Sequence, residues 1–445
     1  MLAAMPPPAT SPSLPADASA RDRGDACPGT LRLHRADDGA LARVRVPGGL
    51  LTAVQADALG AVAESLGDGE LHLTSRGNVQ LRGLSPDCGG ELAGRLGEAG
   101  LLPSARHERI RNIVASPLSG LDDSGAADVG PWLRALDSLL CAGEGTAGLS
   151  GRFLFVLDDG RGDVDALGGD VTLLAQDGGA ALLRIGTART VVRIPGARAP
   201  QAALMAAEIF LERASGTGAW RVSELPGGAG SLLDEVVRRL REEDPGTAVT
   251  EDRGCPRGSD GPAPGVVTGP HDGAALSAGI PLGRITPAQW RSLTDTARHR
   301  GRGELRLTPW RGVVVPGVER RRAAGLLDEL GATGLVVGAD SPWTGVGACI
   351  GRPGCAKSLA DVRARAAAVV GPVGLLPVYW SGCERRCGHP RGEWVDVVAV
   401  PGGHRISVVR GEERDAPVSV PDSPASPDSP GGLAEAVASA RGTRG

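Results

Sequence analysis

Apolar and polar residues alternate along two short segments that lie far apart in the chain. The first is residues 69–74, with the sequence GELHLT, and the second is residues 303–308, with the sequence GELRLT. Such alternation predicts a half-buried β-strand at each place. A helix is predicted ahead of each strand, where Thr52 and Thr286 stand as N-cap residues.

These segments belong to an internal repeat. Residues 46–55 (VPGGLLTAVQ) match residues 280–289 (IPLGRITPAQ) at an offset of 234, and the same offset aligns the two strand segments without a gap. Each copy reads as a strand, a helix and a strand, which is half of a ferredoxin-like unit. We therefore predict an α+β fold in which two ferredoxin-like halves pair into one pseudo-symmetric platform, with two separate small domains as the alternative.

The rest of the chain divides around the two copies. Strands are predicted near 152–157, 181–185 and 190–194, and helices near 131–140 and 201–215. The predicted domains are a disordered N-terminus (1–25), ferredoxin-like half 1 (27–105), a mixed α/β tetrapyrrole-binding domain (106–240), a Gly-, Pro- and Asp-rich linker (241–272), ferredoxin-like half 2 (273–332), a mixed α/β cluster-binding domain (333–412) and a disordered tail (413–445).

Four cysteines lie near the C-terminal end as two pairs. Cys349 and Cys355 form a C-x5-C pair, Cys383 and Cys387 form a C-x3-C pair, and 27 residues separate the pairs. Neighbouring glycines let backbone amides approach sulfide closely. Because two short loops can supply the four thiolates of a [4Fe–4S] cluster, we predict such a cluster here.

Structural zinc, disulfides and buried free thiols are the alternatives. Structural zinc usually takes more closely spaced ligand pairs, so the wide first spacing counts against it. Disulfides need an oxidising compartment, whereas no continuous apolar segment of a signal peptide occurs in residues 1–30. We therefore expect a cytoplasmic protein with reduced thiols. The isolated cysteines, expected in packing or at the surface, are Cys27, Cys88, Cys141 and Cys255.

The bulk composition excludes some classes of function. The 445 residues carry a formal net charge of -4 and include no run of about twenty apolar residues, so we expect neither nucleic-acid nor membrane partners. Lys357 is the single lysine among 48 Lys and Arg residues. It either screens the cluster or is an ordinary residue at a helix start, and every other cation of this kind is an arginine.

Three short segments of the first half of the chain and one of the second copy concentrate side chains that could bind carboxylates. A guanidinium can bind a carboxylate through two hydrogen bonds and practically never gives up its proton. Such residues could converge on a ligand with several carboxylates, and a solvated charged surface is the alternative. The candidates are Arg76, Asn78, Gln80, Arg111, Arg152 and Arg311.

Together, the repeat, the segment 74–80, the Arg111-Asn112 pair and the cysteine pairs resemble the nitrite/sulfite reductase superfamily over roughly residues 27–410. The resemblance implies that the four cysteines bind a [4Fe–4S] cluster and that Cys387 also bridges to the iron of a sirohaem. It further implies that Arg76, Arg111 and Arg152 hold tetrapyrrole carboxylates or reach an anionic substrate.

One departure points to a particular branch of this superfamily. Its reductases carry a Lys-x-Lys-like pair where this chain has Arg152-Phe153-Leu154, so the second basic residue is missing. A site whose cations are all arginine has no obvious general acid for a reduction that consumes many protons. The segments 26–29, 152–160 and 307–312 resemble instead the precorrin-3B synthase family of aerobic cobalamin biosynthesis, which implies that the tetrapyrrole is the substrate.

That family resemblance implies an oxidoreductase, a monooxygenase that hydroxylates precorrin-3A at C-20 with O2 and closes a γ-lactone. It also implies a mononuclear non-haem iron, although the scattered histidines assign no ligands to it, and no catalytic residue is assigned. No G-x-G-x-x-G follows a strand, so we expect an external electron donor, an NADH-linked reductase or a ferredoxin. Two alternatives stay open: a sulfite or nitrite reductase of the ferredoxin type with bound sirohaem, and a non-catalytic electron carrier or tetrapyrrole-binding protein.

Overall fold

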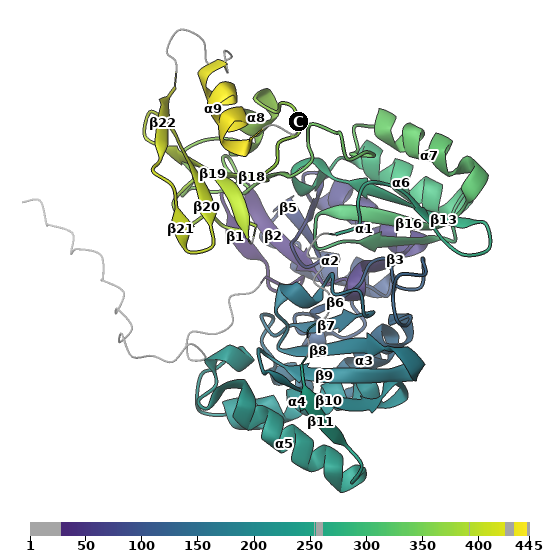
Figure 1. Cartoon of the computed structure of the whole chain (residues 1–445). Helices are drawn as coiled ribbons and strands as arrows, with labels where there is room; N and C mark the ends of the chain where they lie inside the picture. The colour runs from purple at the N-terminus through teal and green to yellow at the C-terminus, as the bar shows by residue number, and fades with distance from the viewer. Residues whose placement is uncertain (1–27, 253, 255–260, 391, 423–430, 443–445) are drawn as a thin grey trace, which may run out of the picture.

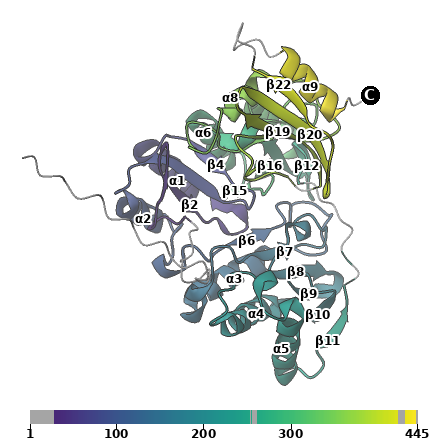
Figure 2. The same ribbon diagram turned by 90° about the vertical axis from the view of Figure 1, so that its left-hand side faces the viewer.

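The computed structural model describes residues 28–252, 254, 261–390, 392–422 and 431–442. Its strands form four sheets, which we call A to D, and helices pack on them (Figure 1). Sheets A and B form the platform, sheet C lies beside one end of it, and sheet D lies beside another (Figures 1 and 2). The predicted α+β fold with two ferredoxin-like halves is confirmed.

The platform consists of two five-stranded sheets with the same internal plan. Sheet A has the order β1-β2-β5-β4-β14, and sheet B has the order β12-β13-β16-β15-β3. The strands are β1 (His34–Ala36), β2 (Gly39–Val44), β3 (Leu50–Thr52), β4 (Leu71–Leu73), β5 (Val79–Leu84), β12 (Gly265–Thr268), β13 (Gly273–Gly279), β14 (Arg284–Ile285), β15 (Glu304–Leu307) and β16 (Gly312–Glu319).

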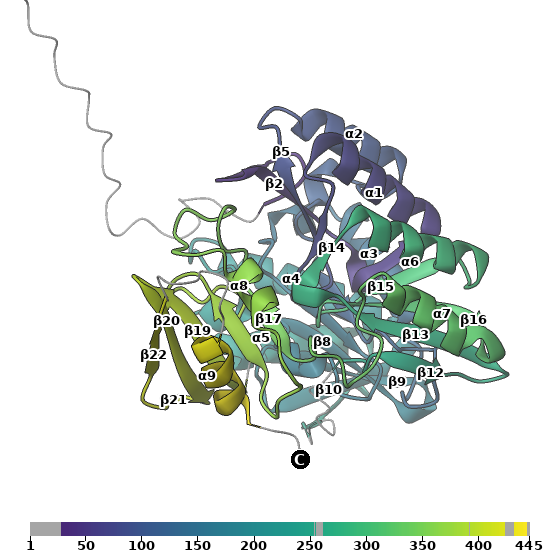
Figure 3. The same ribbon diagram turned by 90° about the horizontal axis from the view of Figure 1, so that it is seen from above.

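Four helices lie side by side along one side of the platform in the order α2, α1, α6, α7 (Figure 3). They are α1 (Ala53–Leu66), α2 (Gly89–Glu98), α6 (Pro287–His299) and α7 (Arg320–Ala332). The two predicted N-caps are confirmed. Thr52 and Thr286 each accept a hydrogen bond from the backbone N–H three residues on, at 3.2 and 3.3 Å, and each forms a complete capping box.

The two halves exchange strands. Strand β3 of the first copy pairs with β15 of the second, and β14 of the second copy pairs with β4 of the first. Each sheet therefore needs both copies to be complete, and one hydrophobic core runs through both. Across the interface between the helices, Trp290 Nε1 donates to the Ala56 carbonyl at 2.8 Å.

Sheets C and D also repeat one plan. In sheet C the pairs β6–β7 and β7–β8 are parallel and β8–β9 is antiparallel, and in sheet D the pairs β17–β18, β18–β19 and β19–β20 follow the same sequence. Sheet C contains β6 (Ile113–Ala115), β7 (Phe155–Asp158), β8 (Val171–Gln176), β9 (Ala180–Ile185), β10 (Thr190–Pro195) and β11 (Ala248–Glu251), with α3 (Gly130–Ala142), α4 (Ala199–Ala214) and α5 (Gly228–Glu243). Sheet D contains β17 (Val346–Ala348), β18 (Val378–Ser381), β19 (Glu393–Val400), β20 (Gly403–Arg410), β21 (Glu413–Arg414) and β22 (Val418–Pro421), with α8 (Val362–Ala368) and α9 (Gly431–Arg441).

Two predicted boundaries need correction. The linker predicted at 241–272 supplies β11 to sheet C and β12 to sheet B. The tail predicted as disordered at 413–445 contains β21 and β22, which pair with β20, and helix α9. Helix α9 buries Leu433 and Val437, one turn apart, against sheet D. Two apolar residues at this spacing are a weak helix signal in a segment rich in Pro, Ser and Ala. The N-terminal residues 1–25 lie outside the described residues.

Among the described residues, no helix combines the length and the apolar character needed to cross a bilayer.

The strand exchange predicts a specific glycine requirement at Gly49. A Cβ atom there would lie 1.9 Å from the Leu307 carbonyl oxygen, and the residue has φ 71. We expect Gly49→Ala to lower the stability of the platform by about 3 kcal/mol or more, measured by urea unfolding. Gly178→Ala is the matched control, because Gly178 has φ 76 and open space around its Cβ position, so that only the backbone cost of about 1 kcal/mol applies. Equal effects of the two substitutions would contradict the close approach.

Candidate functional site

The cysteine pairs follow two neighbouring parallel strands. Strands β17 and β18 pair in parallel, so both end at the same edge of sheet D. Cys349 comes directly after β17, and Cys383 comes two residues after the end of β18. The backbone N–H of Gly382 donates to Cys349 Sγ at 3.2 Å, so one cysteine pair lies against the other.

The loop after Cys349 brings Cys355 back to this edge. The N–H of Leu359 donates to the carbonyl of Gly382 at 2.8 Å, and Gly382 is the residue before Cys383. A side chain at Gly382 would overlap this loop, because a Cβ there would lie 1.8 Å from Ser358 Oγ. The glycine is thus required by the close approach of the two loops.

The first half of the chain also holds the Cys355 loop. Arg82 of β5 makes two hydrogen bonds of 2.7 Å to Asp38 and donates to the Gly354 carbonyl at 2.9 Å. Asp37 accepts from the N–H of Ala356. Strand β5 and the turn between β1 and β2 therefore contact the chain on the two sides of Cys355, and the cysteine site lies where the two halves meet.

The loop between Cys383 and Cys387 is fixed from sheet D. Tyr379 Oη donates to the Cys387 carbonyl at 2.6 Å. Arg386 has φ 47, which is unfavourable for an arginine, and its Nε donates at 2.7 Å to Asp396, a fully buried residue of β19. This buried ion pair holds the strained backbone between the two cysteines.

The donor set fits an iron–sulfur cluster. Burial raises the pKa of the Cys349 thiol, and the nearby Cys383 and Cys387 add to the effect. Cys387 is exposed, whereas the other three cysteines are half-buried. Cysteine binds a metal centre as the thiolate, and the iron of a [4Fe–4S] cluster takes four such ligands. The four cysteines would hold that cluster. Cys387, the exposed one, would face any further group bound beside it.

Of the residues predicted to bind a ligand, Asn78 belongs to a buried polar network. It accepts a hydrogen bond from the Val46 N–H at 3.0 Å and donates to Asn112 Oδ1 at 3.4 Å. Arg45, which is 3% exposed, donates to the same Asn112 oxygen at 3.1 Å and to the Gly151 carbonyl at 2.9 Å. The network thus joins the segments of three predicted residues, Asn78, Arg111 and Arg152.

Arg111 and Arg152 themselves have partners within the protein. Arg111 is buried, makes two 2.7 Å hydrogen bonds to Asp137 and donates to the Leu101 carbonyl at 3.0 Å. A tetrapyrrole carboxylate would have to displace Asp137 from it. Arg152 lies 5.4 Å from the ring centroid of Trp220 and 3.2 Å from a Glu224 oxygen, with its side chain 44% exposed. Ligand binding by these two arginines stays a prediction.

The remaining predicted residues, Arg76, Gln80 and Arg311, are half-buried. Arg76 lies in the turn between β4 and β5, and Gln80 lies on β5. Arg311 occupies the equivalent turn of the second copy and packs over Tyr379 of sheet D, 5.8 Å from the ring centroid. Arg311 is therefore the member of the predicted set that demonstrably contacts the strand leading to Cys383.

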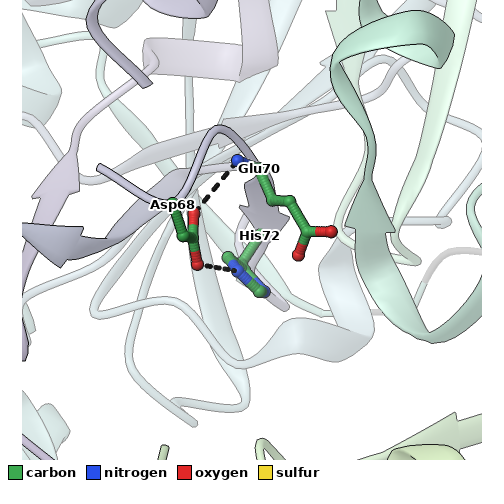
Figure 4. A group of neighbouring side chains, drawn as sticks. All are labelled: Asp68, Glu70 and His72. Atoms are coloured by element: carbon green, nitrogen blue, oxygen red, sulfur yellow. Dashed lines mark hydrogen bonds and ion pairs between the residues drawn. The ribbon is translucent and has the colours of Figure 1, made fainter. Parts of the chain in front are cut away.

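Asp68, Glu70 and His72 offer ligand atoms within 4.8 Å of one another (Figure 4). His72 Nδ1 lies 3.1 Å from Arg363 Nη1 and must accept the hydrogen bond, because a guanidinium only donates. Nε2 therefore carries the imidazole proton and faces Asp68 at 3.7 Å. Burial, the largest cause, lowers the pKa of His72, so the ring is neutral at neutral pH. This tautomer does not suit metal binding at Nε2.

A buried acidic cluster occupies the equivalent edge of sheet C. Asp158 ends β7, and Asp159 and Asp163 follow it, beside Ser116 at the end of β6. Asp158 accepts hydrogen bonds from backbone amides of the loop, and Asp159 binds Arg161. Burial, only partly offset by the Ser116 hydrogen bond, raises the pKa of Asp163 to about 6, with the charges of its two aspartate neighbours adding to it. Hydrogen bonds within the protein therefore satisfy most of the carboxylate oxygens of this cluster.

Sequence reasoning missed Arg45, His72, Arg82 and Arg363. Comparison of the two copies could have found the first three, because the offset of 234 pairs them with Gly279, Arg306 and Pro316. Where one copy has a polar residue and the other copy has a different residue type at the aligned position, the polar residue has a role in one copy only. Arg363 lies outside the repeat and carries no such signal.

Comparison with known proteins agrees with this architecture. Residues 33–99 and 269–333 match the nitrite/sulfite reductase ferredoxin-like half domain family. The NirA protein of Mycobacterium tuberculosis has the same fold, with a TM-score of 0.66 and 18% identity over 86% of this chain and 77% of that chain. Both copies of the repeat therefore match the ferredoxin-like half domain of nitrite/sulfite reductases, and the chain shares its fold with NirA.

Among curated relatives, a precorrin-3B synthase from Sinorhizobium sp is 28% identical over 416 residues, covering 90% of this chain and 86% of the relative. A ferredoxin–nitrite reductase from Synechococcus elongatus is 27% identical over 389 residues, covering 79% and 74%. A birch chloroplast ferredoxin–nitrite reductase (Betula pendula) is 26% identical over 78% of this chain and 65% of its own length. The predicted resemblance to nitrite/sulfite reductases and to a precorrin-3B synthase is therefore confirmed.

The Asp396 ion pair predicts a role in holding the second cysteine loop. We expect Asp396→Asn to lower stability by about 3 kcal/mol, because Arg386 and Arg414 both lose the buried counter-ion that they share. The variant should also retain less iron than the wild type after anaerobic purification. Asp415→Asn is the control, because its side chain is 54% exposed and its pair with Arg410 lies away from the cysteines. Unchanged stability and iron content in Asp396→Asn would contradict this role.

The raised pKa of Asp163 predicts a pH dependence with a definite sign. The folded state binds this proton more tightly than the unfolded chain, so its contribution is present below the ordinary pKa of 3.8 and is lost as the pH rises through about 6. Asp163→Asn should therefore be more stable than the wild type at about pH 7.5, by about 3 kcal/mol, and should lose this advantage toward about pH 4. The exposed Asp234→Asn should show no such change. Destabilisation by Asp163→Asn at the higher pH would show that the charged form is favoured.

Proposed function

We propose that this protein is a monooxygenase of the precorrin-3B synthase type. In this proposal a polycarboxylate tetrapyrrole, precorrin-3A, is the substrate, hydroxylation occurs at C-20, and an acetate side chain closes a γ-lactone. One oxygen atom enters the product and the other leaves as water, which takes up two electrons and two protons. The cluster held by Cys349, Cys355, Cys383 and Cys387 would supply one-electron transfer from an external donor.

The observation that carries the proposal concerns Leu154. This residue stands where the reductases of the resembled superfamily have the second basic residue, and it is 2% exposed in an apolar cluster with Val114, Val156 and Val164. Phe153 is fully buried against Phe155 and Phe210. No cation can occupy these positions without reorganising the core of sheet C. A proton-donating lysine is therefore absent from this segment.

The comparison with the Sinorhizobium precorrin-3B synthase supports the same choice, because the match extends over nearly the whole of both chains. The expected mononuclear iron has no assigned ligands, and the Asp68, Glu70 and His72 group does not fit it for the tautomer reason given above.

A ferredoxin-type nitrite or sulfite reductase with bound sirohaem is the second candidate. The nitrite reductase relatives and the exposed position of Cys387 favour it, because an exposed thiolate could also bind a haem iron. The two candidates differ in the fate of the tetrapyrrole, which is consumed in the first case and retained in the second.

Turnover with labelled oxygen tests the proposal. We expect anaerobically purified protein, given precorrin-3A, a reducing donor and 18O2, to form a product that carries one 18O atom, detected by mass spectrometry. Cys387→Ser should lose most of its iron and sulfide and this activity, whereas Cys141→Ser, a half-buried cysteine of α3, should retain both. Unlabelled product, or rapid reduction of nitrite or sulfite by the same preparation, would contradict the proposal. Full iron content and activity in Cys387→Ser would contradict the assignment of the ligand.

A further inference from the structure

We propose that Arg311 and Arg363 form a cationic seat that neutralises the iron–sulfur cluster and raises its reduction potential. This inference rests on the cluster assignment within the proposed function. It concerns two arginines of the second half of the chain that approach the cysteine loops.

Arg363 contacts the first cysteine directly. It lies in α8, and its Nε donates to the Cys349 carbonyl at 3.3 Å, while its Nη1 donates to His72 Nδ1 at 3.1 Å. Both acceptors are neutral. Among the described residues, no carboxylate forms an ion pair with Arg363, so the charge of this largely buried guanidinium is unbalanced within the protein.

Arg311 approaches the backbone beside both Cys349 and Cys387. A Cβ atom on Gly347 would lie 3.3 Å from Arg311 Nη1, and a Cβ on Gly388 would lie 3.4 Å from Nη2. Gly388 directly follows Cys387, and Gly347 precedes Cys349 by two residues. The guanidinium also packs on Tyr379. No carboxylate in the described part of the chain pairs with it either.

The backbone of Arg311 indicates that this placement has a cost. Arg311 has φ 59, a left-handed conformation that a non-glycine residue rarely adopts, and its repeat counterpart Gly77 has φ 65. The second copy therefore places an arginine where the first copy uses the residue best suited to the turn. Strain of this kind is typical of functional positions.

The surrounding carboxylates do not relieve the two charges. Arg82 binds Asp38, and Arg284 binds Glu70, so these acids are already paired with other arginines. The site therefore holds a surplus of positive charge at the cysteine loops.

An assembled cluster would supply the missing negative charge. Four thiolates outweigh the positive charge of the iron–sulfur core, so the centre is an anion, and reduction makes it more negative. A nearby fixed cation stabilises the reduced form more than the oxidised form. His72, neutral and accepting from Arg363, holds this guanidinium toward Cys349 and leaves its charge in place.

The experiment is an anaerobic redox titration of the reconstituted cluster, followed by EPR spectroscopy. We expect Arg363→Gln and Arg311→Gly to shift the potential to more negative values, with the ratio of reduced to oxidised cluster at a fixed potential falling about tenfold for each. Glycine is chosen at position 311 because it suits the backbone. Arg363→Lys should recover most of the shift. Arg321→Gln is the control, because this side chain is 78% exposed on α7.

Wild-type potentials in Arg363→Gln and Arg311→Gly, with the cluster present, would overturn the inference and leave the cluster assignment intact. Failure of the wild type itself to assemble a cluster would instead refute the assignment on which it rests. If Arg363→Gln assembles no cluster, recovery of assembly by Arg363→Lys supports the seat, and failure of the lysine variant overturns it.

A second experiment measures the binding of uroporphyrin, a polycarboxylate tetrapyrrole, by fluorescence. Weaker porphyrin binding with an unchanged potential would show that the two arginines serve a substrate carboxylate, and would also overturn the inference.

Discussion

The exchange of β3 and β14 between the two ferredoxin-like halves is the constraint on which the rest of the structure depends. Each strand completes the sheet of the other copy, and a Cβ on Gly49 would lie 1.9 Å from the Leu307 carbonyl oxygen at this crossing. Because neither sheet is complete alone, the register of one half fixes the position of the other. Two side chains of the first half, His72 of β4 and Arg82 of β5, can therefore make hydrogen bonds to helix α8 and to the Cys355 loop of the second half.

Duplication followed by divergence explains how one plan yields two different edges. Sheets C and D share the same order of parallel and antiparallel pairs, and the loops after equivalent strands carry acids in sheet C and cysteines in sheet D. At the acidic edge, the carboxylates accept hydrogen bonds from backbone amides, Ser116 and Arg161. The cysteine edge is surrounded by arginines whose charge the protein balances only in part. An anionic centre at the second edge would complete this balance.

Much of the fold could be predicted from the sequence because local signals agree with the tertiary structure. The repeat at an offset of 234 identified both halves, and the N-caps at Thr52 and Thr286 follow from short-range hydrogen bonding. The strand exchange could not be predicted, since pairing between distant strands leaves no local pattern. The tail was misjudged because composition outweighed the spacing of Leu433 and Val437, which matters only once sheet D is in place.

The sequence predicts the cluster ligands but not the residues that support their loops. Cysteine spacing reflects local loop geometry, whereas Arg363 and Asp396 contribute through contacts that only the folded chain creates. Arg111 is the opposite case. It was predicted to bind a ligand because it is an arginine, yet in the folded chain it donates two hydrogen bonds to Asp137.

The central claim is that the cysteines hold a cluster in a protein whose tetrapyrrole is a substrate. The most direct test is the visible spectrum of anaerobically purified protein, from cells that make sirohaem, together with iron, sulfide and tetrapyrrole analysis. We predict a broad absorption near about 400 nm, roughly four sulfides per chain and no stoichiometric tetrapyrrole. One retained sirohaem per chain, with its bands in the red region, would contradict the account.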